Sequence, residues 1–257
     1  MKYIKIFGIT IVSIIALWFL ASFYLAGQSS TLIFNNKVSW APVPQYNYKL
    51  DFLKNSANQN FSTWTFENKS TDEYILYLHG NSGRIADLIP NLEAKANVIS
   101  LAYPGYSESE GDPTVENVYE AALITYDSMI SKGIPENKIT ILGHSMGGSP
   151  ATYLASMKPK AKKLILINTF SSVQSMCFRQ YSILCGFVGN IFNTANNAPK
   201  VIIPVRHFAY KGDLSVPFAE NQLLFTYFTG SKDKKFIEMN KYTHTYPDFE
   251  LDRKSVV

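Results

Sequence analysis

The segment GHSMGG, residues 143–148, is the part of this chain best suited to covalent chemistry. Ser145 lies between Gly143 and Gly147 in the pattern G-x-S-x-G, after an apolar run and before a stretch of small residues. A sharp strand-to-helix turn would expose the serine oxygen and direct helix N–H groups at an oxyanion formed beside it. A glycine-rich helix start has the same letters, so the interpretation depends on whether the chain also supplies a base, an acid and oxyanion donors.

A serine hydroxyl is a poor nucleophile until a base accepts its proton, and the chain contains four histidines. His144 lies inside the turn, and His79 ends an apolar run before a glycine. His207 lies within another apolar run, where a packed and hydrogen-bonded histidine is expected. His244 follows the last apolar run in a polar segment, and we predict it to be the base. The alternative for a lone histidine of this kind is a surface residue.

The base needs a carboxylate that orients it and stabilises its cation. Asp213, in the segment KGDLSVP, directly follows an apolar run, and we predict it to be this acid rather than a helix cap or a turn former. It follows Ser145 and precedes His244, which is the order found in one serine-hydrolase fold. We predict that the N–H groups of Asn81 and Met146 form the oxyanion hole.

Short apolar runs alternate with helical patterns along most of the chain. After a strand-like segment, NFSTWTFE, the apolar runs are EYILYLHG, VISLAYPGY, NKITILGHS, KKLILINTF, VIIPVRHFAYKGD and KKFIEMN. Helices are predicted over residues 83–97, 114–133, 146–157 and 216–228, with Thr114 as the N-cap of the second and Gly133 past its end. This alternation predicts an α/β fold with a mostly parallel central sheet flanked by helices. Reactive loops of such sheets lie at the carboxyl ends of the strands, where every candidate site residue falls.

Four segments together resemble the α/β-hydrolase superfamily, and most closely the Bem46-like and serine-aminopeptidase-like hydrolases. They are LYLHGNSG, AYPGYSESEG, LGHSMGG and YKGDLSVP, and His244 follows them. The resemblance implies an α/β-hydrolase fold with Ser145 as nucleophile, Asp213 as acid, His244 as base and Asn81 lending an oxyanion N–H. The chain departs from the family at Thr243, where relatives commonly have glycine, and after His244, where a closing helix is usual.

Residues 171–200 occupy the place of a larger cap in other members of the superfamily. Five apolar residues of this insert have helical spacing, which predicts a helix packed on the sheet or, alternatively, a small lid lining an acyl pocket: Leu184, Phe187, Val188, Ile191 and Phe192. Cys177 and Cys185 are the only cysteines, and they can pair or remain buried thiols. Neither they nor the histidines have metal-ligand spacing, so no metal site is predicted.

Residues 1–30 differ from the rest of the chain. Residues 6–26 carry no charge and follow Lys2 and Lys5, which predicts a signal anchor with its N-terminus in the cytoplasm. The hydrolase domain, residues 31–257, would then lie on the exported side of a membrane. The alternative is a cleaved signal peptide and a secreted or periplasmic domain.

The composition and the motifs together predict a membrane-anchored serine hydrolase. The net charge of +4 includes the two N-terminal lysines, and no basic stripe indicates nucleic-acid binding. The expected substrate is a small-molecule carboxylic ester or thioester, of acyl or lipid-like kind, and no cofactor is expected. The alternatives are a non-catalytic binding protein of the same fold at a membrane, and an acyltransferase or peptidase using the same residues.

Overall fold

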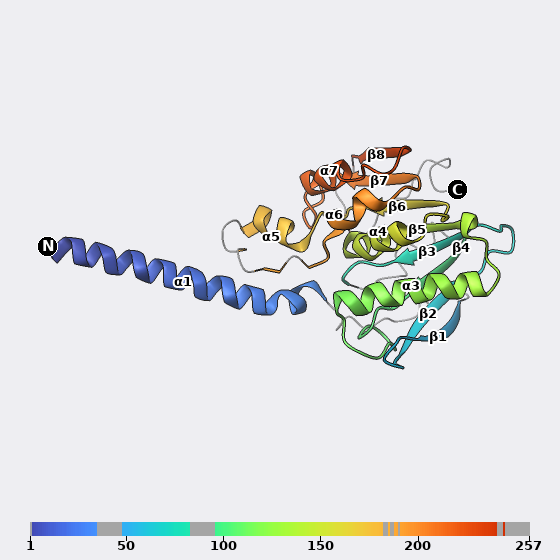
Figure 1. Ribbon diagram of the computed structural model, residues 1–257, viewed down its shortest axis with the longest axis horizontal. Coiled ribbons are helices and arrows are strands. Elements are labelled where there is room, and N and C mark those ends of the chain that lie inside the picture. The colour runs from blue at the N-terminus through green and yellow to red at the C-terminus, as the bar shows by residue number, and fades with distance from the viewer. Residues whose placement is uncertain are drawn as a thin grey trace.

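The computed structural model describes residues 2–34, 48–82, 96–181, 185, 188–189, 191–240 and 244. Its centre is an eight-stranded sheet with the order β1-β2-β4-β3-β5-β6-β7-β8 (Figure 1). The strands are β1 (Lys49–Lys54), β2 (Asn60–Phe66), β3 (Tyr74–Leu78), β4 (Asn97–Leu101), β5 (Ile139–His144), β6 (Lys163–Ile167), β7 (Val205–Tyr210) and β8 (Lys234–Met239). The helices are α1 (Lys2–Ile33), α3 (Val115–Ser131), α4 (Gly148–Met157), α5 (Val173–Tyr181), α6 (Thr194–Asn197) and α7 (Phe218–Thr226).

The strand directions confirm the predicted mostly parallel sheet. Strands β4, β3, β5, β6, β7 and β8 are parallel to one another, whereas β1 and β2 pair antiparallel at one edge. The sequence analysis did not predict β1, whose side chains are mostly exposed or half-buried and so give a weak apolar signal. Because the parallel strands share one direction, their carboxyl ends meet at one edge of the sheet.

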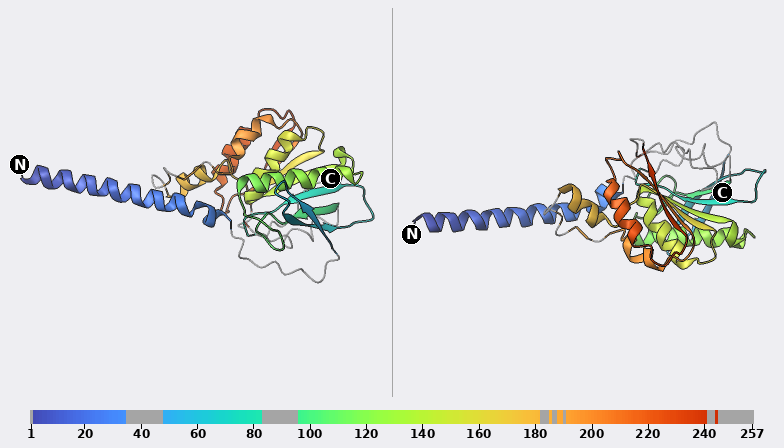
Figure 2. Two further views of the ribbon diagram at one scale, coloured as in Figure 1. Left: turned by 60° about the horizontal axis from the view of Figure 1, so that its bottom comes forward. Right: turned by 90° about the horizontal axis from the view of Figure 1, so that it is seen from above.

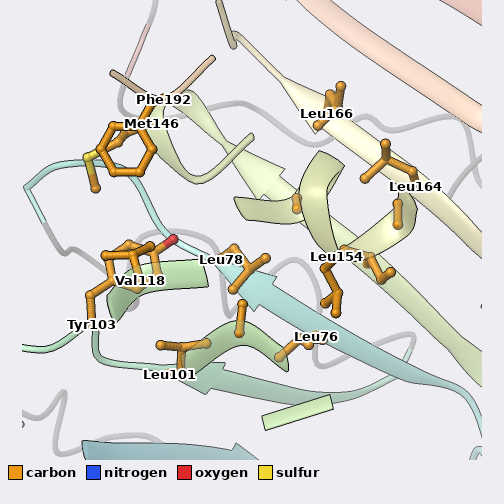
Figure 3. Close-up of a cluster of buried hydrophobic side chains, with 14 of the residues drawn as sticks. Leu76, Leu78, Leu101, Tyr103, Val118, Met146, Leu154, Leu164, Leu166 and Phe192 are labelled. Atoms are coloured by element: carbon orange, nitrogen blue, oxygen red, sulfur yellow. The ribbon is translucent and has the colours of Figure 1, made fainter. Parts of the chain in front are cut away.

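Both faces of the sheet are buried, which explains why its central strands are continuous apolar runs. Leu76 and Leu78 of β3 face the core beneath α3 and α4, which Figure 3 shows. Ile75 and Tyr77 alternate with them and belong to a second buried cluster on the opposite face. The sheet is thus a rigid platform for the loops at its carboxyl edge.

Helix α3 begins and ends where its capping residues predict. The Thr114 side chain accepts a hydrogen bond of 3.1 Å from the N–H of Asn117. Past the C-terminus, Gly133 has a φ of +86°, a left-handed conformation that favours glycine. The helix predicted over residues 83–97 lies largely outside the described residues.

The helix predicted from the apolar spacing of the insert is wrong in its described part. Val188 lies in a bend, and Ile191 and Phe192 lie in a turn. Phe192 has a φ of +47°, which an α-helix does not allow. Val188 and Phe192 are nevertheless buried, so the apolar residues reach the core without helical backbone. The helices of the insert are α5 and α6 instead, and Cys177 is disulfide-bonded to Cys185.

Helix α1 projects away from the domain over most of its length, and its C-terminal end meets the domain (Figures 1 and 2). Large apolar side chains along it are exposed, among them Phe7, Val12, Leu17 and Phe23. Among the residues that the structure describes, no helix is both long enough and apolar enough to cross a membrane. The structure therefore does not support the predicted N-terminal transmembrane helix.

Candidate active site

Ser145 lies on a strained turn between β5 and α4. Its φ is +54°, a left-handed conformation that a non-glycine residue adopts at a cost of about 1–2 kcal/mol. The turn leaves no room for side chains on its flanks, because a Cβ on Gly143 would lie 2.5 Å from the carbonyl oxygen of Gly147. A Cβ on Gly147 would lie 2.1 Å from the carbonyl oxygen of Leu78. The two glycines of G-x-S-x-G therefore allow the close approach on which the turn depends.

His244 lies between Ser145 and Asp213. Its Nε2 is 3.0 Å from Oγ of Ser145, and its Nδ1 is 2.6 Å from Oδ2 of Asp213. These contacts require the tautomer that carries a proton on Nδ1 and offers a free electron pair at Nε2 to the serine. The structure thus brings together three residues that are 31 and 99 positions apart in the chain.

Asp213 is held rigidly at the end of β7. Its Oδ1 accepts hydrogen bonds from the backbone N–H groups of Ser215 (2.8 Å) and Val216 (2.9 Å), and its side chain is fully buried. The other oxygen is left for His244. Asp213 is therefore also a turn former, the role that the sequence analysis treated as an alternative to that of the acid.

His144 is hydrogen-bonded to the backbone of His244. Its Nε2 lies 2.8 Å from the backbone carbonyl oxygen of His244, and because a carbonyl only accepts, Nε2 must carry the proton. Burial, reinforced by nearby His244, lowers the pKa of His144 to about 3. His144 is therefore a neutral donor at physiological pH.

The loop after β3 lies against the nucleophile. A Cβ on Gly80 would lie 3.3 Å from Cβ of Ser145. The Gly80 carbonyl, which belongs to the peptide that also carries the Asn81 N–H, lies 2.6 Å from Nδ1 of His79. Burial lowers the pKa of His79 to about 4, so this histidine is neutral and can donate to that carbonyl. The hydroxyl of Tyr106 donates to the Asn81 carbonyl at 2.9 Å.

A cavity of about 200 Å³ opens beside Ser145. Asn81 and Met146, the two predicted oxyanion residues, both line it together with Ser145 and His244. The remaining lining residues are mostly apolar: Ile33, Phe170, Val173, Met176, Ser215 and Val216. The cavity therefore places the candidate nucleophile, base and oxyanion residues around one apolar space.

His207 is a structural histidine, as the sequence predicts. It is fully buried in β7, and its Nε2 lies 2.9 Å from Oδ1 of Asn221 on α7. Burial lowers its pKa to about 4. It does not line the cavity beside Ser145.

Comparisons with known proteins agree with the fold. A family model described as "alpha/beta hydrolase fold" matches residues 73–187. An α/β hydrolase of Vibrio vulnificus has a similar structure, with a TM-score of 0.68 over 80% of this chain and 78% of that one at 19% identity. An esterase of Pyrococcus furiosus superposes with a TM-score of 0.64 over 79% of this chain and 85% of that one at 16% identity. The chain has the α/β-hydrolase fold.

Curated relatives with an α/β-hydrolase domain match shorter stretches. The protein WAV2 of Arabidopsis thaliana is 32% identical over 122 residues, which are 45% of this chain and 40% of WAV2. The protein aho-3 of Caenorhabditis elegans is 31% identical over 40% of this chain and 33% of its own length. The chain thus matches less than half of the length of either relative. These comparisons confirm the resemblance to α/β hydrolases, and the Bem46-like subgroup stays a prediction.

Sequence reasoning missed four residues of this site. His144 and His79 were considered only as possible bases, whereas the structure uses them as neutral donors that hold the loops of the site. Tyr106 lies in AYPGYSESEG, one of the four family-like segments, so that segment was the available signal. Ile33 had no signal, because it belongs to the segment next to the predicted anchor.

Proposed function

We propose that this chain is a serine hydrolase that cleaves carboxylic ester or thioester bonds of small acyl compounds. The observation that carries the proposal is the hydrogen-bonded series Ser145–His244–Asp213, with distances of 3.0 and 2.6 Å. Without a hydrogen-bonded base at this position, the serine hydroxyl would be a poor nucleophile. The cavity beside Ser145 offers the substrate a place next to the nucleophile.

In the proposed mechanism, Oγ of Ser145 attacks the carbonyl carbon of the substrate while Nε2 of His244 takes its proton. The buried carboxylate of Asp213 stabilises the imidazolium that forms. The N–H groups of Asn81 and Met146 stabilise the oxyanion of the tetrahedral intermediate. His244 then gives its proton to the departing alcohol or thiol. Water, deprotonated by the same histidine, releases the acid and restores Ser145.

The alternative of a non-catalytic binding protein predicted that His244 would lie beyond hydrogen-bonding reach of Ser145. The separation of 3.0 Å favours the hydrolase. The names of similar structures also favour it, since the Pyrococcus furiosus protein is called an esterase and another similar structure holds ferulic acid in an enzyme of Butyrivibrio proteoclasticus. An acyltransferase would use the same residues and differ only in the acceptor of the acyl group.

Attachment to a membrane through residues 6–26, with the catalytic domain exported, stays a prediction from the sequence. Its support is the uncharged segment that follows Lys2 and Lys5. Cell fractionation followed by carbonate extraction tests it. Recovery of the full chain in the soluble fraction would contradict the prediction without affecting the proposed reaction.

Covalent labelling of the full chain by a fluorophosphonate tests the proposed function. We expect labelling of wild type and loss of labelling in both Ser145→Ala and His244→Ala. Ser156→Ala on α4, which lies outside the cavity, is the matched serine control and should be labelled like wild type. Hydrolysis of a short p-nitrophenyl ester should fall by roughly 10⁴-fold or more in Ser145→Ala.

Three results would contradict the proposal in different ways. A folded wild-type chain that is not labelled at all would favour the non-catalytic binding protein. Labelling of Ser145 that survives in His244→Ala would show that another group activates the serine. Labelling without release of the acyl group to water, but with release to an alcohol, would favour the acyltransferase.

A further inference from the structure

The C-terminal end of α1 belongs to the site. Ile33, the last residue of α1, lines the cavity beside Ser145. The next residue, Phe34, is 6% exposed and packs against Phe192, with ring centroids 5.4 Å apart. Much of α1 projects away from the domain, and this end meets the domain (Figure 2). Ile33 is thereby held against the cavity by a buried neighbour.

Helix α5 supplies another part of the cavity wall. Val173 and Met176, three positions apart on one face of α5, both line the cavity. Phe170 precedes α5 and also lines it. Val216, from the segment after β7, adds a further apolar side chain. Apart from the reacting groups, the cavity therefore offers a substrate mainly hydrocarbon.

Another face of α5 is fixed to the domain by a buried carboxylate. Glu220 of α7 is fully buried and accepts hydrogen bonds of 2.7 Å from the hydroxyls of both Ser171 and Ser175. Arg179, one turn after Ser175, forms an ion pair with the same carboxylate. The disulfide between Cys177 and Cys185 also joins α5 to a later part of the same insert. The α5 wall is thus held at several points, whereas Ile33 is the described lining residue from α1.

The size of the cavity limits the acyl group that it can hold. A volume of about 200 Å³ lies below the range of about 300–1,000 Å³ that is usual for sites of drug-sized ligands. The cavity is therefore small, and it fits a short acyl chain better than a long fatty chain.

We propose that Ile33 closes the acyl side of the cavity and sets the length of the acyl chain that the enzyme accepts. The substrate class is then esters or thioesters of short, unbranched acids, and the end of α1 is a specificity-determining part of the active site. This inference rests on the proposed function, because it concerns the acyl group that Ser145 would receive. It gives α1 a role in the site that is independent of any role in a membrane.

The test is a chain-length profile measured on the full chain. Values of kcat/KM are determined for p-nitrophenyl esters of four, six, eight and ten carbons with wild type, Ile33→Ala and Ile33→Phe. One methylene more or less in an apolar pocket changes kcat/KM by about 10- to 200-fold. We expect Ile33→Ala to raise the eight-to-four-carbon ratio at least about tenfold, and Ile33→Phe to lower the six-to-four-carbon ratio.

Ile11→Ala is the matched control, because it makes the same change on the same helix at an exposed position. Its profile should equal that of wild type, and Tm values should show that all variants are folded. An unchanged profile in both Ile33 variants, with four-carbon hydrolysis intact, would overturn the role of Ile33 and leave the proposed function standing. A wild-type preference for ten carbons, or labelling of Ser145 without hydrolysis of any ester, would overturn the short-acyl assignment. A folded wild-type chain with neither labelling nor hydrolysis would overturn both proposals.

Discussion

The imidazole of His144 donates its Nε2 proton to the backbone carbonyl of His244 across 2.8 Å. The residue next to the candidate nucleophile thus holds the backbone of the candidate base. Among the residues that the structure describes, this bond and the contacts of the His244 ring join His244 to the site.

We expect His144→Leu to lower kcat for a short ester by about 10- to 100-fold with little change in KM. The variant removes the donor that positions His244 and leaves Ser145, His244 and Asp213 in place. His144→Gln retains an N–H donor on a side chain of similar reach and should recover most of the lost rate. A purely packing role for His144 would instead give equal losses in the two variants.

We expect Tyr106→Phe to lower kcat by about tenfold. The variant removes the hydroxyl that donates to the Asn81 carbonyl, so the proposed oxyanion N–H of Asn81 is held less firmly. Loss of an oxyanion donor outright costs roughly 3–4 kcal/mol, and a loosened donor should cost a fraction of that. Tyr119→Phe is the control, because its hydroxyl bonds Ser149 outside the cavity. Equal rates for wild type and Tyr106→Phe would remove Tyr106 from the site.

We expect Gly147→Ala to destabilise the fold by about 3 kcal/mol or more, and to abolish activity. The added methyl group would lie 2.1 Å from the Leu78 carbonyl oxygen, which forces β3 and the nucleophile turn apart. Gly133→Ala is the comparison, because its methyl group would meet nothing within 4 Å and costs only the strain of a positive φ, about 1–2 kcal/mol. Urea unfolding measures both. Similar losses for the two variants would show that the turn can relax.

We expect the free energy of unfolding to decrease as the pH falls from about 6.5 to about 4. Burial lowers the pKa of His207 to about 4, so the unfolded chain binds a proton in this range that the folded chain does not. Stability therefore rises with pH across this window and is lost as the pH falls. The contribution is on the order of 2–3 kcal/mol for one such histidine, and His79 acts in the same direction.

His207→Gln measures the share of this histidine. Glutamine can still donate to Asn221, so we expect the variant to lose less stability than wild type between pH 6.5 and pH 4. The quantity compared is the change in the free energy of unfolding between the two pH values. The free energy of unfolding at neutral pH is not compared, because the substitution also alters the packing around β7. Parallel pH profiles for the two proteins would show that His207 remains neutral in the unfolded chain or becomes charged in the folded one.

Much of the fold follows from local patterns in the sequence. The apolar runs that become β3, β5 and β6 are continuous because both of their faces are buried, and this alone indicates a parallel sheet covered by helices. The cap at Thr114 and the glycine at position 133 define α3 through hydrogen bonds and backbone conformations that involve near neighbours only. Ser145 and its flanking glycines are predictable for the same reason, since a strained turn constrains the residues that form it.

The tertiary structure decided the contacts between residues that are far apart in the sequence. No pattern near Ile33 indicates a cavity, because the contact arises only when the end of α1 docks beside Phe192. His144 and His79 resemble candidate bases in the sequence, and burial is what turns them into neutral donors. The apolar spacing around Val188 and Phe192 predicts a helix, but burial needs only that these side chains reach the core, and a left-handed Phe192 achieves this without one. Sequence determined the local turns and the order of the site residues, whereas the packing of distant segments determined how those residues are held and what the cavity can accept.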